Sequence, residues 1–297
     1  MPHVLTLVAP PGALSPSLLP PVRAALAALG ADCGMPDWLA EREAADIPFQ
    51  NLAAEPAMAA ARAAIGEAPV DAIAQPVASR KKSLLLADMD STIVTTETLD
   101  ELAAEAGLKE RIAAITARAM NGELDFKAAL RERVAMLKGL EEAALERTWA
   151  TTELMPGARE LVATMRGAGA YCALVSGGFT FFTGRVAALV GFHEHRSNVL
   201  EVAGGRLTGT VAEPILDKDS KLSALKEIAG ARGIPLDCAV TVGDGANDLP
   251  MLLAAGLGVA FRAKPAVQAA ARARVTHGDL RTLLFAQGFR AAEIAVG

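Results

Sequence analysis

Four short apolar runs, each bounded by small or acidic residues, constrain the fold of the chain from Ser83 onward. They are SLLLADMD (83–90), AYCALVSGG (170–178), AVTVGDG (239–245) and LGVAF (257–261). Continuous apolar runs of this length are typical of strands that are buried on both faces. Segments with helical periodicity lie between them, for example Pro156–Gly167 and Leu249–Ala255. This alternation predicts an α/β fold, with a Rossmann-like parallel sheet and helices on both of its faces.

Residues 97 to about 150 interrupt this alternation, because they carry helical patterns only. The segment follows the first of the four predicted strands, so it is expected at the carboxyl edge of the sheet. Open α/β sheets bind their ligands at that edge. We therefore expect an all-helical cap that acts as a lid over a site.

Residues 1–80 show a different pattern, which predicts a separate small α+β domain. Segments 3–10 and 70–77 are typical of strands, and segments 15–30 and 55–67 are typical of helices. The polar stretch at 78–82 marks the boundary with a second predicted domain, 81–297. Residues 1–80 contain no cluster of chemically active side chains, so a regulatory, a dimerising and a stabilising role all stay open.

The composition of the chain argues against two classes of function. A net charge of −5 is not typical of proteins that bind nucleic acid. Alanine supplies much of the 52% apolar content, and no uninterrupted apolar run is long enough to span a membrane. The three cysteines are scattered and the first residues lack the features of a signal peptide. The sequence therefore predicts a cytoplasmic protein with no membrane or nucleic-acid partner.

Asp88 and Asp90 follow the first apolar run directly. Residues i and i+2 of an extended segment point to the same side, so both carboxylates can face one pocket beyond the strand. Their repulsion raises one pKa unless a cation compensates for it. The pair is suited to nucleophilic and acid–base catalysis, or to binding Mg²⁺. The alternative is a solvated turn, where Asp is common.

The third apolar run ends in GDGAND (243–248), which contains Asp244 and Asp248. Its two glycines permit unusual backbone angles. A carboxylate at this strand end could meet Asp88 across the crevice and complete a set of oxygen ligands for Mg²⁺. The string does not match the dinucleotide-binding fingerprint, because Asp248 replaces its last glycine. The alternative is ordinary capping of the next helix.

Ser176 and Gly177 stand where the second run is expected to end before a helix. Free backbone N–H groups and the Ser176 hydroxyl would there form an anion site, although a simple strand–turn–helix link is the alternative.

Lys221 is expected in the first turn of a helix, where the helix dipole disfavours a cation. A phosphate would be a suitable partner for it, but a solvated lysine is the commoner case. Lys218 and Lys226 are rivals for the same role.

Together, these groups suit phosphoryl transfer with Mg²⁺, a carboxylate nucleophile and donors for phosphate oxygens. The chain has no Walker A motif, so it is not expected to be a P-loop NTPase. The motifs resemble those of the haloacid dehalogenase superfamily of phosphatases: DMDST (88–92), Ser176, Lys221 and GDGAND (243–248) match in order. The resemblance covers about residues 82–284, and the strings at 88–103, 124–140, 175–182 and 242–252 are most similar to its phosphoserine phosphatases.

The resemblance implies chemical roles for four aspartates. Asp88 would attack phosphorus and become an aspartyl-phosphate. Asp90 would first protonate the leaving oxygen and then activate water. Mg²⁺ would bind the Asp88 carboxylate, the backbone carbonyl of Asp90 and Asp244, with Asp248 in support.

The resemblance also implies a set of substrate-binding residues. These are Glu97, Arg133, Ser176, Gly177, Lys221 and Asn247. Glu97 would bind an ammonium group and Arg133 a carboxylate, while Asn247 would bind a further substrate or phosphate group. A planar guanidinium suits a carboxylate. Phe126 precedes Arg133 by seven residues, so both share one helix face, and it is implied to help close the lid.

The activity implied is Mg²⁺-dependent hydrolysis of O-phospho-L-serine to serine and phosphate, the last step of serine biosynthesis. The partner is thus a small molecule, and a homodimer is left open. One alternative is a phosphotransferase, or a phosphatase for another small phosphomonoester. Another is a catalytically idle regulatory protein, against which the intact set of Asp88, Asp90, Lys221 and Asp244 argues.

Overall fold

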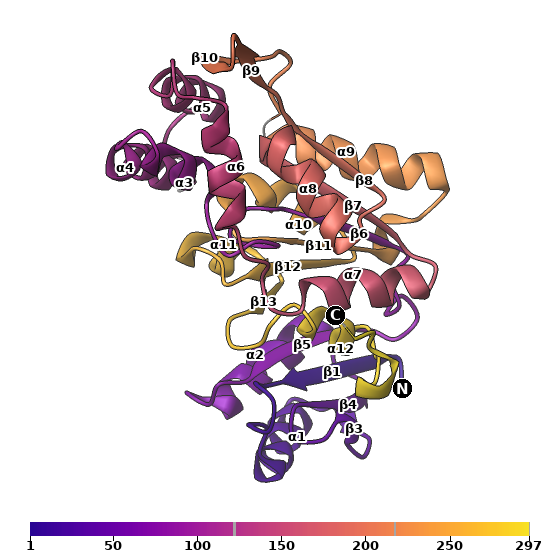
Figure 1. The fold of residues 1–297 in the computed structure, drawn as a ribbon. Helices are drawn as coiled ribbons and strands as arrows, with labels where there is room; N and C mark the ends of the chain where they lie inside the picture. The colour runs from indigo at the N-terminus through magenta and orange to yellow at the C-terminus, as the bar shows by residue number, and fades with distance from the viewer. Residues whose placement is uncertain (121–122, 217, 297) are drawn as a thin grey trace.

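A six-stranded parallel sheet forms the centre of the computed structural model, which describes residues 1–120, 123–216 and 218–296 (Figure 1). The strands lie in the order β13-β12-β11-β6-β7-β8. Their bounds are β6 Leu84–Ala87, β7 Tyr171–Phe179, β8 Glu194–Asn198, β11 Ala239–Gly243, β12 Leu257–Phe261 and β13 Ala273–Val275. The four apolar runs form the four inner strands, so the predicted parallel sheet is confirmed.

The side chains of β6 alternate between two hydrophobic cores, one on each face of the sheet. Leu85 and Ala87 belong to the core that includes residues of α7 (Ala158–Gly167) and α8 (Thr180–Val190). Leu84 and Leu86 belong to the core built with α9 (Lys218–Arg232) and α10 (Leu249–Ala254). Because helices cover both faces, both sets of side chains are buried, and the strand is apolar throughout.

The register of the central strands determines which polar residues meet at the carboxyl edge. Ala87 of β6 pairs with Val242 of β11 on one side and with Leu174 of β7 on the other. Three polar residues lie one or two positions after these paired residues: Asp88 after Ala87, Asp244 after Val242 and Ser176 after Leu174. Three segments that are far apart in sequence therefore deliver polar side chains to one place.

A helical cap is inserted between β6 and β7, as predicted. Its helices are α3 Thr98–Ala104, α4 Lys109–Met120, α5 Phe126–Ala135 and α6 Ala143–Ala150. In Figure 1 they form a group at the end of the molecule opposite the N-terminal sheet.

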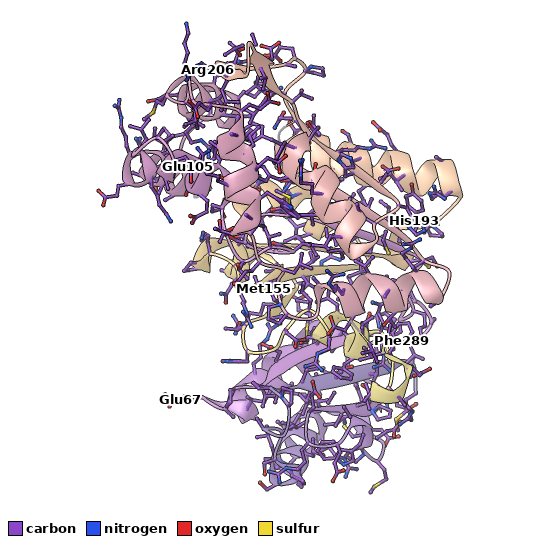
Figure 2. The ribbon with its side chains drawn as sticks, viewed as in Figure 1. Glu67, Glu105, Met155, His193, Arg206 and Phe289 are labelled. Carbon is purple, nitrogen blue, oxygen red and sulfur yellow. The ribbon has the colours of Figure 1, made fainter. Side chains whose placement is uncertain are left out.

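A β-hairpin that the sequence did not predict packs against the cap. It consists of β9 (Leu200–Ala203) and β10 (Arg206–Val211), and β10 contacts α5. Figure 2 labels Arg206, the first residue of β10, at the top of the molecule. The Gly139 N–H donates to the Leu207 carbonyl at 2.8 Å, and the Leu207 N–H donates to the Leu140 carbonyl at 2.9 Å. The hairpin is largely exposed, so it lacks the apolar pattern that marks a buried strand.

Residues 1–76 form a five-stranded sheet whose strand pairs are antiparallel. Its strands are β1 His3–Val8, β2 Asp32–Cys33, β3 Asp37–Ala40, β4 Ala44–Gln50 and β5 Asp71–Pro76, and its helices are α1 Leu19–Ala28 and α2 Ala54–Ile65. Both helices share one hydrophobic core with the sheet. The sequence predicted β1, β5 and both helices but missed β4, because Pro48 and the buried Asp46 are unusual inside a strand. The division into two domains stays a prediction.

Hydrogen bonds join the N-terminal sheet to the C-terminal part of the chain. The Gln75 side chain donates to the Ala286 carbonyl at 2.6 Å, and Arg80 donates to the same carbonyl at 2.8 Å. Arg80 also forms an ion pair with Asp46 of β4 at 2.7 Å. The remaining helices are α11 Pro265–Ala270 and α12 Thr282–Ala286, with 3-10 turns at Pro16–Leu18, Leu236–Cys238, Ala246–Asp248 and Ala291–Glu293. Within the described ranges, no helix combines the length and apolarity that a membrane span requires.

Candidate active site

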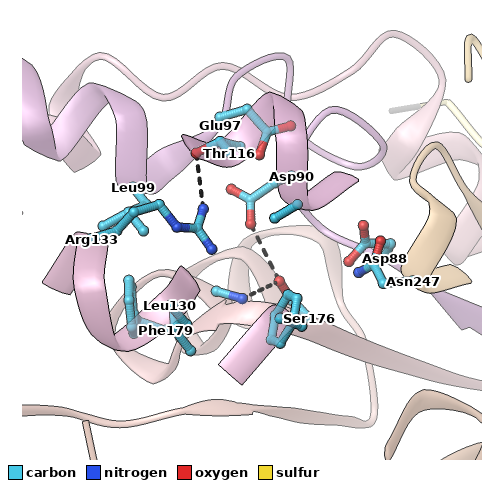
Figure 3. A pocket seen from close by; sticks show the side chains of 14 residues that line it. Asp88, Asp90, Glu97, Leu99, Thr116, Leu130, Arg133, Ser176, Phe179 and Asn247 are labelled. Atoms are coloured by element: carbon cyan, nitrogen blue, oxygen red, sulfur yellow. Dashed lines mark hydrogen bonds between the residues drawn. The ribbon is translucent and has the colours of Figure 1, made fainter. Parts of the chain in front are cut away.

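A small cavity of about 70 Å³ lies between the carboxyl edge of the core sheet and the cap (Figure 3). Both parts contribute to the fourteen residues that line it. Seven of the nine predicted site residues are among them: Asp88, Asp90, Glu97, Arg133, Ser176, Gly177 and Asn247. The other two, Lys221 and Asp244, do not line the cavity but lie close to Asp88.

Lys221 is held between two carboxylates. Its Nζ lies 2.7 Å from Asp88 Oδ1 and 2.5 Å from Asp248 Oδ1, and all three side chains are buried. Burial alone lowers the pKa of Lys221, but the carboxylates of Asp248 and Asp88 outweigh it and raise that pKa overall. The ammonium therefore stays charged. Of its rivals, Lys226 is exposed, and the side chain of Lys218 lies outside the described part of the chain.

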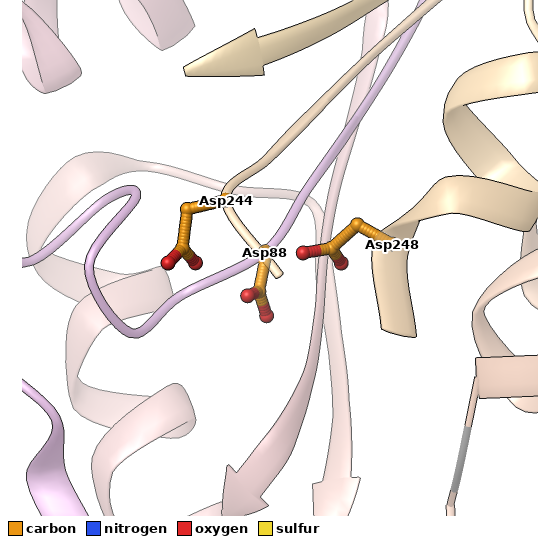
Figure 4. Close-up of side chains that lie close together, drawn as sticks. All are labelled: Asp88, Asp244 and Asp248. Atoms are coloured by element: carbon orange, nitrogen blue, oxygen red, sulfur yellow. The ribbon is translucent and has the colours of Figure 1, made fainter. Parts of the chain in front are cut away.

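Asp88, Asp244 and Asp248 form a buried acidic cluster at the ends of β6 and β11 (Figure 4). Each offers a carboxylate oxygen, and these oxygens lie within 4.8 Å of one another. Burial and the charge of Asp248 raise the pKa of Asp88 to about 8, and burial with Asp248 and Asp88 raises the pKa of Asp244 to about 9. Gathering these groups without a further cation is thus unfavourable.

The cluster fits a divalent metal ion. The Oδ1 atom of Asp244 is buried and has no hydrogen-bond donor among the described residues. Lys264 approaches the other oxygen of Asp244 only to 4.0 Å. Clustered carboxylate oxygens are the ligands that hard divalent cations prefer, and such an ion would offset the excess negative charge.

Asp90 is oriented differently, because its carboxylate faces the cavity. The Thr98 N–H donates to its Oδ1 at 2.8 Å, and the Ser176 hydroxyl donates to its Oδ2 at 3.3 Å. Burial raises the pKa of Asp90, and these hydrogen bonds partly oppose that rise. A carboxyl group with a raised pKa and a place beside the cavity is suited to hold and release a proton.

The segment around Ser176 differs from the sequence prediction. Strand β7 does not end at Ser176 but continues to Phe179, with irregular pairing to β8 between Val175 and Phe179. The Gly178 N–H donates to the Ser176 hydroxyl at 2.8 Å, so that amide is already engaged. The irregular stretch of strand, and not a helix terminus, places Gly177 at the cavity.

A cap residue packs directly against Gly177. A Cβ atom added at Gly177 would lie 2.7 Å from Cζ of Phe126, the first residue of α5. The side chain of Asn198 donates to the Gly177 carbonyl at 2.8 Å and so fixes this backbone from the other side. The absence of a side chain at Gly177 is therefore what lets the cap approach the core so closely.

Glu97 and Arg133 reach the cavity from the cap, and Figure 3 shows both beside Asp90. The Ser91 hydroxyl donates to Glu97 Oε1 at 2.6 Å. Burial and the charge of Asp90 raise the pKa of Glu97 to about 7. Arg133 is buried on α5, and burial lowers its pKa against the opposing effect of nearby carboxylates. An acidic and a basic group thus face one small space.

Sequence reasoning missed the residues that hold Arg133 in place. Arg133 Nη1 donates to the Thr116 hydroxyl at 2.9 Å, and that hydroxyl lies 2.7 Å from Asp100 Oδ1, to which it donates. Asp100 lies in the first turn of α3, where acidic residues are common for helix-dipole reasons and give no functional signal. Asn198, by contrast, ends β8 and could have been found by asking which polar residues follow each strand.

Comparison with known proteins identifies the class to which this fold and site belong. Residues 85–253 match the family model of haloacid dehalogenase-like hydrolases. Since the match covers more than half of the chain, the protein belongs to the haloacid dehalogenase-like hydrolase family.

Curated relatives narrow the likeness within that family. The chain is 42% identical over 238 residues to a phosphoserine phosphatase of Streptomyces coelicolor, a match that covers 80% of this chain but 58% of that protein. It is 46% identical over 202 residues to a phosphoserine phosphatase of Streptococcus thermophilus, covering 68% of this chain and 94% of that one. The chain thus spans little more than half of the longer relative.

Solved structures resemble both the core and the whole chain. A phospho-aspartyl intermediate analogue of phosphoserine phosphatase is 40% identical with a TM-score of 0.66, covering 69% of this chain and 98% of that one. An unliganded probable phosphoserine phosphatase from Vibrio cholerae is 30% identical with a TM-score of 0.77, and the match covers 98% of this chain and 88% of that one. The second likeness extends over the N-terminal sheet as well.

Proposed function

We propose that the protein is a Mg²⁺-dependent phosphoserine phosphatase that hydrolyses O-phospho-L-serine to L-serine and phosphate. One observation carries the proposal: a single small cavity joins an acidic cluster suited to phosphoryl chemistry to an acid–base pair suited to an amino acid. Relatives that carry the name phosphoserine phosphatase support it.

The substrate would be recognised at both of its ends. Glu97 would bind the ammonium group, and Arg133 would bind the carboxylate through its planar fork. Ser176, Gly177 and Lys221 would bind the phosphate oxygens, and Asn247 would bind a further substrate or phosphate group. A cavity of about 70 Å³ argues against large substrates. Its position under α3 and α5 means that the cap would have to open to admit the substrate.

The chemistry would proceed in two displacements at phosphorus. In the first, a carboxylate oxygen of Asp88 forms a bond to phosphorus, the bond from phosphorus to the serine oxygen breaks, and Asp90 gives its proton to that oxygen. In the second, Asp90 takes a proton from water, the water oxygen forms a bond to phosphorus, and the bond from phosphorus to the Asp88 oxygen breaks, which releases phosphate and restores Asp88.

Asp88, Asp244 and the backbone carbonyl of Asp90, with Asp248 in support, would hold Mg²⁺, which offsets negative charge as phosphate approaches the carboxylates. Lys221 would stay charged throughout, since two carboxylates face it. Its ammonium lowers the pKa of Asp88 against the effect of burial, and together with the bound cation it would favour the ionised, attacking form of Asp88.

The cellular setting we infer is the cytoplasm. Cys33, Cys172 and Cys238 are all free, which fits a reducing compartment. A role in serine biosynthesis follows from the proposed product.

A substrate screen tests the proposal. Purified protein with Mg²⁺ should release equal amounts of serine and phosphate from O-phospho-L-serine. It should act far more slowly on phosphoethanolamine, which lacks the carboxylate, and on glucose 6-phosphate.

EDTA should abolish turnover, and Asp88→Asn should lower it roughly 10³-fold or more. The matched control, Asp237→Asn at an exposed position, should behave as wild type. Equal rates on phosphoserine and glucose 6-phosphate would overturn the assignment. Consumption of phosphoserine without release of free phosphate would overturn it as well.

A further inference from the structure

A second cavity, of about 240 Å³, lies between the N-terminal sheet and the edge of the core sheet. The end of α2 and the start of β5 form one wall, while α11, β13 and the segment after β13 form the other. Figure 1 shows β13 beside β5 and α2, and β13 contacts β5 directly. This cavity shares no lining residue with the candidate active site.

Two arginines face this cavity from opposite walls. Arg62 comes from α2 and Arg274 from β13, and both are half-buried. Among the described residues, neither guanidinium has an ion-pair or hydrogen-bond partner, and Nη2 of Arg62 is shut off from solvent. Burial and the nearby charge of Arg274 both lower the pKa of Arg62. Two unpaired cations in one partly buried space are unfavourable unless an anion joins them.

The acidic residue in the wall does not neutralise this pair. The carboxylate of Asp71 accepts hydrogen bonds from the backbone N–H groups of Thr276 at 2.8 Å, His277 at 3.1 Å and Gly278 at 2.8 Å. It lies close enough to raise the pKa of Arg62, but a single carboxylate offsets only one of the two positive charges. The cavity lining therefore keeps an excess of positive charge.

We propose that this cavity is a binding site for a small oxyanion, either a carboxylate or a phosphate group, held between Arg62 and Arg274. Guanidinium groups present paired N–H donors that match both kinds of anion. Because Arg62 lies on α2, which packs on the N-terminal sheet, and Arg274 lies on β13 of the core sheet, the anion would bridge the two parts of the molecule. The site does not depend on the proposed phosphatase activity.

Counting bound anions tests the site directly. Equilibrium dialysis with Mg²⁺ present would measure the equivalents of inorganic phosphate and, separately, of succinate bound by wild type, Arg62→Gln and Arg274→Gln. Wild type should bind one more equivalent of at least one anion than either variant, or bind it at least tenfold more tightly. The anion that shows the loss identifies the class of ligand. Arg62→Lys, which keeps the charge but not the fork, should retain weakened binding.

Matched controls separate the site from a general effect of charge. Arg272→Gln removes an exposed arginine two residues from Arg274 that lies outside the cavity, and it should bind both anions as wild type does. Circular-dichroism melting curves of Arg62→Gln and Arg274→Gln that are as cooperative as that of wild type would show that both variants fold. Equal equivalents and affinities for both anions in wild type, Arg62→Gln and Arg274→Gln would overturn the proposal.

Discussion

Glu97 faces the active-site cavity from the cap side, and its charge should govern the response to pH. Its pKa is raised from 4.5 to about 7, because burial and the charge of Asp90 disfavour the carboxylate. As pH falls below about 7, the free protein increasingly carries a neutral Glu97 that no longer attracts an ammonium group. We expect kcat/KM for phosphoserine to fall on that side, approaching tenfold per pH unit.

A substrate pair isolates this effect from the other titrating groups. The ratio of kcat/KM for phosphoserine to that for phosphoglycolate, which lacks the ammonium, should drop as pH falls through 7. In Glu97→Gln the ratio should be low and independent of pH. A wild-type ratio that stays constant from pH 5.5 to 8.5 would show that Glu97 does not bind the ammonium group.

Thr116 acts on the site through Arg133. Its hydroxyl accepts from Arg133 and donates to Asp100, so Thr116→Val would free the guanidinium from a buried partner. The loss of one such hydrogen bond costs about 1 kcal/mol, or roughly fivefold in KM for phosphoserine. The value of kcat should change little, because Thr116 does not touch the reacting phosphate in the proposed mechanism. Thr116→Ser keeps the hydroxyl and should restore the wild-type KM, whereas an equal defect in both variants would contradict a positioning role.

Contact between α5 of the cap and β7 of the core depends on the missing side chain at Gly177. Gly177→Ala would push a methyl group against the Phe126 ring, at 2.7 Å from Cζ, and so hold the cap away from the core. We expect kcat/KM to fall at least tenfold, although the backbone N–H of residue 177 is kept. Replacing Phe126 by Leu in the same chain should recover part of the loss. Steady-state kinetics of the two single variants and the double variant check this, and additive losses would rule out the steric account.

Sequence patterns predicted the elements that have a regularly buried surface, either on both faces of a strand or on one face of a helix. Strand β6 is covered on both faces, so its four residues are all apolar and easily identified. The cap helices were found because one face of each is buried, for example Leu130, Arg133 and Val134 on α5. Hairpin β9–β10 has little buried surface, and it therefore left no pattern to find.

The site residues at the carboxyl edge of the sheet could be predicted from the sequence, whereas those on the cap helices could not. Asp88 and Asp244 directly follow inner strands and Ser176 lies on a third, so their meeting is a consequence of parallel register. Arg133 and Glu97 were proposed only by resemblance, since a helix arginine and a first-turn glutamate have ordinary surface roles. Thr116 and Asp100 could not be inferred, because their contact depends on how α3, α4 and α5 pack together.

Across the whole molecule, Asp71 ties the N-terminal sheet to the core. Its buried carboxylate accepts three backbone N–H groups from residues 276–278. Asp71→Asn would replace one accepting oxygen with an amide nitrogen that cannot accept. We expect this to destabilise the attachment of the sheet by about 1–3 kcal/mol.

Fluorescence can follow this attachment, because the chain has two tryptophans, Trp38 in the N-terminal sheet and Trp149 in the cap. In a Trp149→Phe background, Trp38 alone reports on urea unfolding of the N-terminal sheet. Asp71→Asn should lower the unfolding midpoint, whereas Asp32→Asn, at an exposed position of the same sheet, should not. Equal midpoints for both variants would mean that Asp71 contributes little to the attachment.

The central claim is that Asp88 takes the phosphoryl group from phosphoserine. Rapid mixing with O-phospho-L-serine labelled with ³²P, followed by acid quenching and peptide mapping, tests it most directly. The account predicts a transient label that hydroxylamine removes, located on the peptide that contains Asp88 and absent from Asp88→Asn. Release of labelled phosphate in the first turnover with no protein-bound label, or a label on a peptide without Asp88, would contradict it.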